Sequence, residues 1–156
     1  MTPELIQQLG DDLFAALRER RTLVPFTNRF SEITVEDAYG ISLQFLNRRV
    51  AAGERVIGKK IGVTSKPVQD MLGVFQPDFG FLTDAMHCAD GATVSLKQTG
   101  LIQPKAEGEI AFMLKADLKG PGITREQVMA ATEWVAPCFE IVDSRIDDWQ
   151  IKIQDT

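Results

Sequence analysis

Two glutamates inside an apolar run constrain this chain more than any other feature. The run extends from Lys105 to Leu114, and its alternating pattern predicts a β-strand. Glu107 and Glu109 then share one face of the strand, while apolar side chains line the other face. Two like charges on one face are costly unless water, protons or a cation compensates them, and carboxylate oxygens are the ligands that Mg²⁺ and Mn²⁺ prefer.

A third glutamate, Glu140, lies in the middle of the apolar run 135–142, which predicts a second strand. A buried glutamate needs a partner, and a position beside Glu107 and Glu109 would give three carboxylates facing one divalent ion. An alternative remains open, with the first pair on a solvated edge and Glu140 paired with an arginine or lysine. Because Glu-x-Glu is common, the spacing alone does not decide between the two.

Composition predicts one globular domain of reduced, cytoplasmic character. The 156 residues are 44% hydrophobic and show no compositional break, so we expect a single domain over 1–156, with a helical segment 1–53 and strands and helices in 54–156. The net charge of -5 and the dispersed lysines and arginines argue against nucleic acid or an anionic membrane as a partner. Two distant cysteines and no signal-peptide or membrane-spanning stretch favour free thiols and a cytoplasmic location.

Capping patterns and periodicity predict an α+β arrangement. Thr2-Pro3 starts a helix that reaches about Arg20, and Thr34 caps a second helix that ends near Ala52. The remaining elements are expected as a strand at 55–63, a short helix after Ser65, a tight loop at 76–80, strands at 92–96, 105–114 and 135–142, and a helix at 125–134.

Two further polar residues lie in unusual settings. Gly58, Lys60 and Gly62 share one face of the strand 55–63, so the lysine has no bulky neighbour there, and glycine in a strand often marks the close approach of a backbone or ligand. Asp78 lies in the expected tight loop. Both have ordinary alternatives, a surface lysine on an edge strand and a turn-forming aspartate. His87 is the only histidine, so a Ser-His-Asp mechanism has little support.

Four strings in register carry a resemblance to a known family. They are Gly-Lys-Lys-Ile-Gly-Val-Thr-Ser at 58–65, Gln-Pro-Asp-Phe-Gly at 76–80, Ala-Glu-Gly-Glu-Ile-Ala-Phe at 106–112, and Phe-Glu-Ile-Val-Asp-Ser-Arg at 139–145. Together they resemble the 2-hydroxypenta-2,4-dienoate hydratases of the fumarylacetoacetate hydrolase superfamily over essentially the whole chain. The related 4-oxalocrotonate decarboxylases share the glutamates and the lysine, but they typically lack counterparts of Lys59 and Asp78. The chain therefore resembles the hydratase branch.

The resemblance implies a Mg²⁺ or Mn²⁺ site formed by Glu107, Glu109 and Glu140, where the ion chelates the substrate's C1 carboxylate and C2 oxygen. Such enzymes add water to 2-hydroxypenta-2,4-dienoate to give 4-hydroxy-2-oxopentanoate in the meta-cleavage degradation of aromatic compounds. It also implies Lys60 as a proton donor or substrate orienter, with a Schiff base as an alternative, and Asp78 as a general base or proton shuttle. Family members are usually homo-oligomers, and these hydratases can associate with the decarboxylase.

The family pattern continues beyond the equivalent of Thr156. The expected fold is therefore the N-terminal part of a mixed α/β β-roll with flanking helices, a hydratase domain that is incomplete as given. Three alternatives accompany the hydratase hypothesis: a 4-oxalocrotonate decarboxylase, which releases CO₂, a catalytically incomplete fragment that acts as a binding or assembly partner, and a C–C bond hydrolase of the same superfamily. For the last, His87 offers no clear base.

Overall fold

The computed structural model describes residues 1–155, apart from the side chains of Leu72 and Gln98. The chain forms two compact units. The first unit consists of Met1–Gln103 and the segment from Ser144 onward, and the second unit is Pro104–Asp143. Both contain helix and antiparallel strands, as expected for an α+β chain. The expectation of a single domain, with a helical segment 1–53, stays a prediction.

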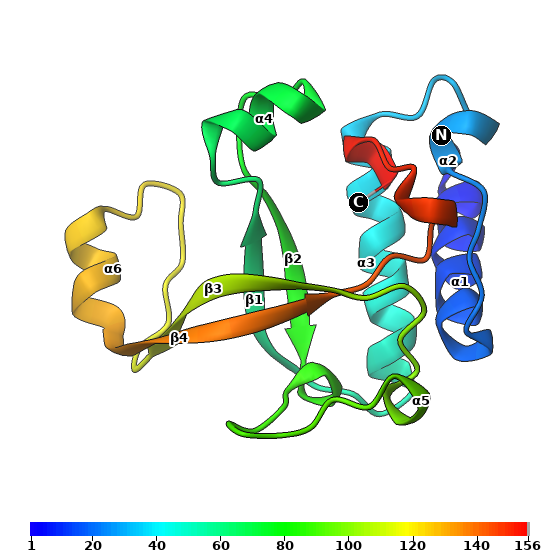
Figure 1. Ribbon diagram of the computed structural model, residues 1–156. Helices are drawn as coiled ribbons and strands as arrows, with labels where there is room; N and C mark the ends of the chain where they lie inside the picture. Colours follow the sequence, from blue (N-terminus) through cyan, green and yellow to red (C-terminus); the bar gives the residue numbers. More distant parts are fainter. Residues whose placement is uncertain (156) are drawn as a thin grey trace. The chain divides into compact units, whose positions relative to one another are not determined.

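The first unit combines two long helices with one strand pair, and the second unit is a strand pair with one helix (Figure 1). The elements of the first unit are α1 (Pro3–Glu19), α2 (Phe26–Arg29), α3 (Val35–Ala51), β1 (Val56–Gly62), α4 (Lys66–Leu72), β2 (Asp78–Thr83), η1 (Asp84–Met86), α5 (Leu96–Thr99), η2 (Asp147–Trp149) and η3 (Ile153–Asp155). The elements of the second unit are β3 (Lys105–Leu114), α6 (Arg125–Ala131) and β4 (Thr132–Val142). Within residues 1–155, none of the helices has the length and apolar character that a membrane span requires.

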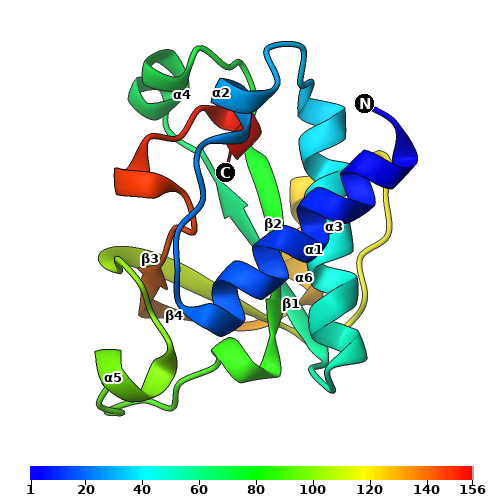
Figure 2. The same ribbon diagram turned by 90° about the vertical axis from the view of Figure 1, so that its right-hand side faces the viewer.

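The core of the first unit lies where α1 and α3 run side by side (Figure 2). Both helices begin at the predicted caps: the Thr2 hydroxyl accepts a hydrogen bond from the Leu5 amide, and Thr34 forms a reciprocal capping box. Apolar side chains at helical spacing then meet across the interface and exclude water. The buried cluster consists of Leu9 and Ile41 from these helices, with Phe26 and Ile33 from the segment between them.

The C-terminal segment returns to the first unit and pairs with its N-terminal part. The Leu23 amide donates to the Arg145 carbonyl at 2.7 Å, and the Asp147 amide donates to the Leu23 carbonyl at 2.9 Å. Ile146, between them, is 2% exposed. At the end of the segment the Asp155 carboxylate accepts from the amide and hydroxyl of Thr27, at 3.1 and 2.8 Å. The segment thus supplies part of the packing of the first unit.

Two secondary-structure expectations are wrong. The strand expected at 92–96 is absent, and the one-turn helix α5 follows it, bounded by Ser95 and by Gly100 with a left-handed φ of 77°. The alternating side chains of 92–96 have no partner strand in the described residues, and without a ladder the pattern does not form a strand. The helix expected at 125–134 ends at Ala131, because Thr132 and Trp134 pair with the end of β3.

The third correction concerns Asp78. This residue is not in a tight loop but is the first residue of β2, where it pairs with Gly62. The chain bends at Phe75 and Gln76, and the strand begins directly after Pro77, inside the stretch expected as a loop. The correction matters because a strand position fixes which face the Asp78 side chain occupies.

Gly10 sets the distance between α1 and α3. A Cβ atom at this position would lie 2.8 Å from the Ile41 carbonyl oxygen and 2.5 Å from Cβ of Gln44. Contacts below 3 Å with a helix backbone cannot be relieved by a rotamer change, so the two helices would have to separate. The glycine is therefore a packing requirement at this crossing.

We predict that Gly10→Ala lowers the free energy of unfolding by about 1–3 kcal/mol, as overpacking does. Helix propensity alone predicts the opposite sign, a gain of about 0.5–1 kcal/mol, because alanine favours helix over glycine. Chemical denaturation followed by circular dichroism separates the two. Gly80→Ala is the control, since its added methyl group would meet no atom within 4 Å.

Asp37 joins the capping box to the N-terminus. One carboxylate oxygen accepts from the Met1 ammonium at 2.8 Å, and the other accepts from the amide and hydroxyl of Thr34 at 3.0 and 2.7 Å. These hydrogen bonds lower the pKa of Asp37 from 3.8 to about 2. The hydrogen bond from the terminal ammonium contributes most, followed by those from Thr34. The ionised form is thus the form that stabilises the fold.

Because the pKa of Asp37 is lower in the folded chain, its contribution to stability is present above pH 3.8 and is lost as the pH falls through about 2. We predict that Asp37→Asn destabilises the chain most above pH 4 and that the difference from the wild type shrinks toward pH 2. Urea denaturation at several pH values measures this. Glu36→Gln removes a charge from the same helical turn without touching the ion pair, and an equal pH dependence in that variant would contradict the assignment.

Candidate metal site and the lysine strand pair

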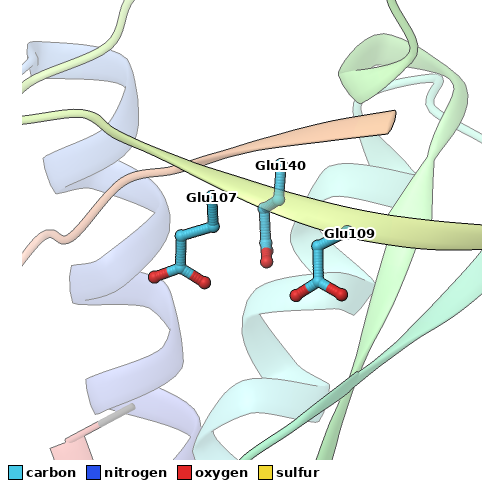
Figure 3. A group of neighbouring side chains, drawn as sticks. All are labelled: Glu107, Glu109 and Glu140. Carbon is cyan, nitrogen blue, oxygen red and sulfur yellow. The ribbon is translucent and has the colours of Figure 1, made fainter. Parts of the chain in front are cut away.

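The register of β3 and β4 brings the three predicted glutamates together. Glu107 lies directly opposite Glu140, and Glu109 lies opposite Cys138. Directly opposite residues of an antiparallel pair project to the same face, so all three carboxylates share one face of the second unit. Each offers a carboxylate oxygen within 4.8 Å of those of the other two (Figure 3). A sequence pair and a distant third residue thus form one cluster.

The opposite face of the same strand pair is apolar. It carries an uninterrupted set of apolar side chains: Ile110, Phe112, Val135, Pro137 and Phe139. Because side chains alternate with period 2, a slip of β3 or β4 by one residue would replace the glutamates of the slipped strand, on their face of the pair, by apolar side chains. In the chain as described, Phe139 is 79% exposed and Ile110 is 59% exposed. We call this set the apolar face of β3–β4.

The glutamate face concentrates negative charge. Glu107 is exposed, and Glu109 and Glu140 are half-buried. Like charges directly opposite one another destabilise a strand pair, whereas a divalent cation between them compensates the repulsion. A donor set made only of carboxylate oxygens fits a hard cation such as Mg²⁺, Mn²⁺ or Ca²⁺ better than a soft one, and three such groups leave coordination positions for water or a ligand. The residues present therefore fit a divalent metal.

Sequence reasoning did not connect Cys138 with this face. The structure places it opposite Glu109, and it is exposed. The available signal was its spacing of two residues from Glu140, which puts both on one face of β4. Its sulfur is a soft ligand, so it does not strengthen the case for a hard cation.

Lys60 and Asp78 form a second group, on β1 and β2. Lys60 lies opposite Gly80, and Asp78 lies opposite Gly62, so the two charged side chains are diagonal neighbours on one face. Both are half-buried, and the Lys60 ammonium donates to the Ile61 carbonyl at 3.1 Å. Glycine at 62 and 80 leaves the space between them without other side chains on their two strands.

Helix α3 holds this strand pair in place through contacts that the sequence did not indicate. The Tyr39 ring stacks on Phe79 with centroids 4.9 Å apart. At the other end of β2, the Arg49 guanidinium, 7% exposed as a residue, binds the Glu54 carboxylate at 2.7 Å and the Thr83 hydroxyl at 3.2 Å. These buried polar groups satisfy one another, and they fix the end of the strand relative to the helix.

The five predicted residues therefore form two groups, each placed by its own strand pair. Glu107, Glu109 and Glu140 converge in the second unit. Lys60 and Asp78 share a face in the first unit. The register places Glu140 opposite Glu107. The metal site, and the alternative in which the first two glutamates lie on a solvated edge and Glu140 pairs with an arginine or lysine, both stay predictions.

Charge repulsion on the glutamate face has a measurable effect on the metal-free chain. We predict that Glu107→Gln, which removes one of two directly opposed charges, raises the free energy of unfolding in EDTA by roughly 0.2–1 kcal/mol. With excess Mg²⁺ the order reverses, because the wild type gains binding energy that the variant loses. Chemical denaturation of the wild type and the variant in EDTA and in excess Mg²⁺ measures both differences in the free energy of unfolding. The matched control is Glu133→Gln on β4, and a gain of the same size there would refute the local explanation.

Comparisons with known proteins give the chain its family. The chain is 72% identical over 153 residues to a 2-hydroxyhexa-2,4-dienoate hydratase of Comamonas testosteroni, covering 98% of the chain and 58% of that relative. It is 64% identical over 156 residues to a 2-hydroxypent-2,4-dienoate hydratase of Pseudomonas putida, covering 100% of the chain and 70% of that relative. No protein-family model matches the chain.

Solved structures agree with this result. A 4-oxalocrotonate decarboxylase from Pseudomonas putida G7, complexed with magnesium and adipate, matches 99% of the chain and 60% of its own length, with a TM-score of 0.92 and 33% identity. The same enzyme with calcium and acetate gives a TM-score of 0.88 and 36% identity over 95% of the chain. The α+β fold expected for the superfamily is thereby confirmed.

The fold is that of the superfamily that includes the 4-oxalocrotonate decarboxylases. Within it, the chain belongs to the 2-hydroxydienoate hydratases, also named 2-keto-4-pentenoate hydratases. The resemblance found in the four sequence strings is thus confirmed. The chain spans little more than half the length of several of these relatives, 58% of the Comamonas protein and 57% of a Paraburkholderia xenovorans hydratase.

Proposed function

We propose that this chain supplies the metal-binding part of a hydratase that adds water to 2-hydroxypenta-2,4-dienoate, giving 4-hydroxy-2-oxopentanoate in meta-cleavage degradation of aromatic compounds. One observation carries the proposal. Three carboxylates converge on one strand pair, in a chain 64% identical to a hydratase named for this substrate. The activity of the chain by itself is part of the proposal, because the relatives are longer.

The proposed metal is Mg²⁺ or Mn²⁺, held by Glu107, Glu109 and Glu140. The all-oxygen donor set and the magnesium and calcium in the solved decarboxylases support a divalent ion. When bound, the ion supplies a Lewis acid that polarises the substrate's 2-oxygen and orients its carboxylate. The three carboxylates repel one another, which lowers the stability of the strand pair. A bound ion would offset this repulsion.

The proposed acid–base groups are Lys60 and Asp78. The lysine ammonium has three donors, and it can orient a substrate oxygen or deliver a proton to a carbon of the dienol. The aspartate can accept the proton of the water that adds at C4. Because Lys60 and Asp78 lie on one face of the β1–β2 pair, proton donation and proton acceptance can act on the same small molecule. A Schiff base at Lys60 would be redundant, because a bound metal would already activate the substrate at C2.

Two observations define the alternatives worth testing. The solved relatives are decarboxylases, yet their identity of 33–36% is about half that of two curated hydratases, at 72% and 64%. The 72% identical relative is named for the hexadienoate substrate, which is one carbon longer. A chain without turnover, serving as a binding or assembly partner, is the third alternative.

Partners and location extend the proposal. The relatives' names support a small organic substrate. We propose a homo-oligomer, association with 4-oxalocrotonate decarboxylase and a cytoplasmic location. The exposed apolar face of β3–β4 supports protein contacts of this kind, because large exposed apolar patches are usually covered by other protein surface.

A metal titration of the purified chain with both dienoate substrates tests the proposal. We expect Mg²⁺- or Mn²⁺-dependent loss of dienoate absorbance, formation of the 4-hydroxy-2-oxo acid and no CO₂. Glu109→Gln should lower kcat/KM at least about 100-fold, since it removes a metal ligand, and Asp78→Asn should lower kcat with metal affinity unchanged. Glu133→Gln is the control for charge.

Each outcome separates the alternatives. Release of CO₂ would assign the decarboxylase activity instead. Metal binding without turnover would contradict activity of the chain alone and favour the partner hypothesis, whereas absence of both would overturn the metal site. Faster turnover of the longer substrate would reassign the preferred dienoate.

A further inference from the structure

The face shared by Lys60 and Asp78 contains an unusually close approach. A Cβ atom built at Gly62 would lie 2.4 Å from Oδ1 of Asp78 and 3.4 Å from its Cγ. The Asp78 carboxylate therefore lies over the backbone of β1, in the space that any larger residue at 62 would fill. The other two glycines of this face differ: at Gly58 the nearest atom would be 3.8 Å away, and at Gly80 nothing lies within 4 Å.

The backbone around Gly62 has little freedom to relieve such a contact. The next residue, Val63, has a φ of 54°, which a β-branched residue rarely adopts. Its carbonyl accepts a hydrogen bond from the Gln69 side-chain amide at 3.0 Å, which ties the end of β1 to α4. Gly62 is also paired in register with Asp78 itself. A larger residue at 62 would therefore displace the Asp78 side chain rather than the strand.

We infer that Gly62 is a positioning residue for Asp78: its missing side chain lets the carboxylate lie across β1 on the face that carries Lys60. The inference deepens the proposed function and rests on it for the role of Asp78. The close approach of the Asp78 carboxylate to Gly62 does not depend on the proposed function. Glycine at 62 is then required for the orientation of the carboxylate and not for a turn, since its φ lies outside the left-handed region.

A double-mutant cycle on the thermal unfolding of the purified chain tests the contact. We expect Gly62→Ala to lower the unfolding midpoint by roughly 2–10 °C, as overpacking does. In an Asp78→Ala background the same change should cost less than half as much, because the clashing carboxylate is gone. Gly80→Ala, on the same face but without a neighbour, should shift the midpoint little in either background.

Equal costs of Gly62→Ala in both backgrounds would overturn the inference, because the effect would then come from the backbone. The same would follow if Gly62→Ala left the midpoint unchanged. If Gly62→Ala proves too unstable to purify, Gly62→Ala with Asp78→Gly replaces it: recovery of a folded chain supports the contact, and failure to recover contradicts it.

Measurements of turnover test whether the contact between Gly62 and Asp78 matters for catalysis. Gly62→Ala should lower kcat at least about 10-fold, with the metal dissociation constant unchanged, and it should cause no further loss when added to Asp78→Ala. Unchanged kcat in a folded variant would overturn the positioning role. If the wild type shows no turnover, the hydratase proposal for this chain fails, while the unfolding cycle still decides whether Gly62 positions the carboxylate.

Discussion

The cross-strand pairing of Glu107 with Glu140 is the contact on which the candidate site depends. Neither residue forms a metal site by itself, and their separation in sequence becomes proximity only through the antiparallel ladder of β3 and β4. The ladder is held in this register by its backbone hydrogen bonds. The repulsion between the carboxylates opposes that register, and a cation bound between them would offset it.

The first unit follows a different principle, in which a helix supports a strand pair. Helix α3 is fixed against α1 by the close contact at Gly10, and it holds β2 through Tyr39 and Arg49. Lys60 and Asp78 therefore lie on strands whose position is set by packing and buried hydrogen bonds. Polar residues on supported strands keep a defined geometry better than residues on free loops.

The sequence predicted those features that depend on local rules. Helix caps at Thr2 and Thr34, the strand around Glu107 and the sharing of a face by Glu107 and Glu109 follow from capping and alternation, and the structure has them. The pairing partner of a strand depends on distant residues, which explains why the local pattern predicts a strand at 92–96 and a loop at Asp78 where the structure has neither. The contacts of Arg49 and Cys138 are tertiary, and no local pattern indicates them.

The return of the C-terminal segment makes the first unit discontinuous in sequence, with the whole second unit inserted between Gln103 and Ser144. During synthesis, β3 and β4 can pair as soon as residues 105–142 have emerged, since the two strands are close in sequence. Ile146 and Asp155 reach Leu23 and Thr27 only after the closure of a loop of more than 100 residues. The first unit is thus begun before the inserted unit and receives its last described contacts after it, because its core from Leu9 to Ile41 is synthesised first and residues 144–155 follow Asp143.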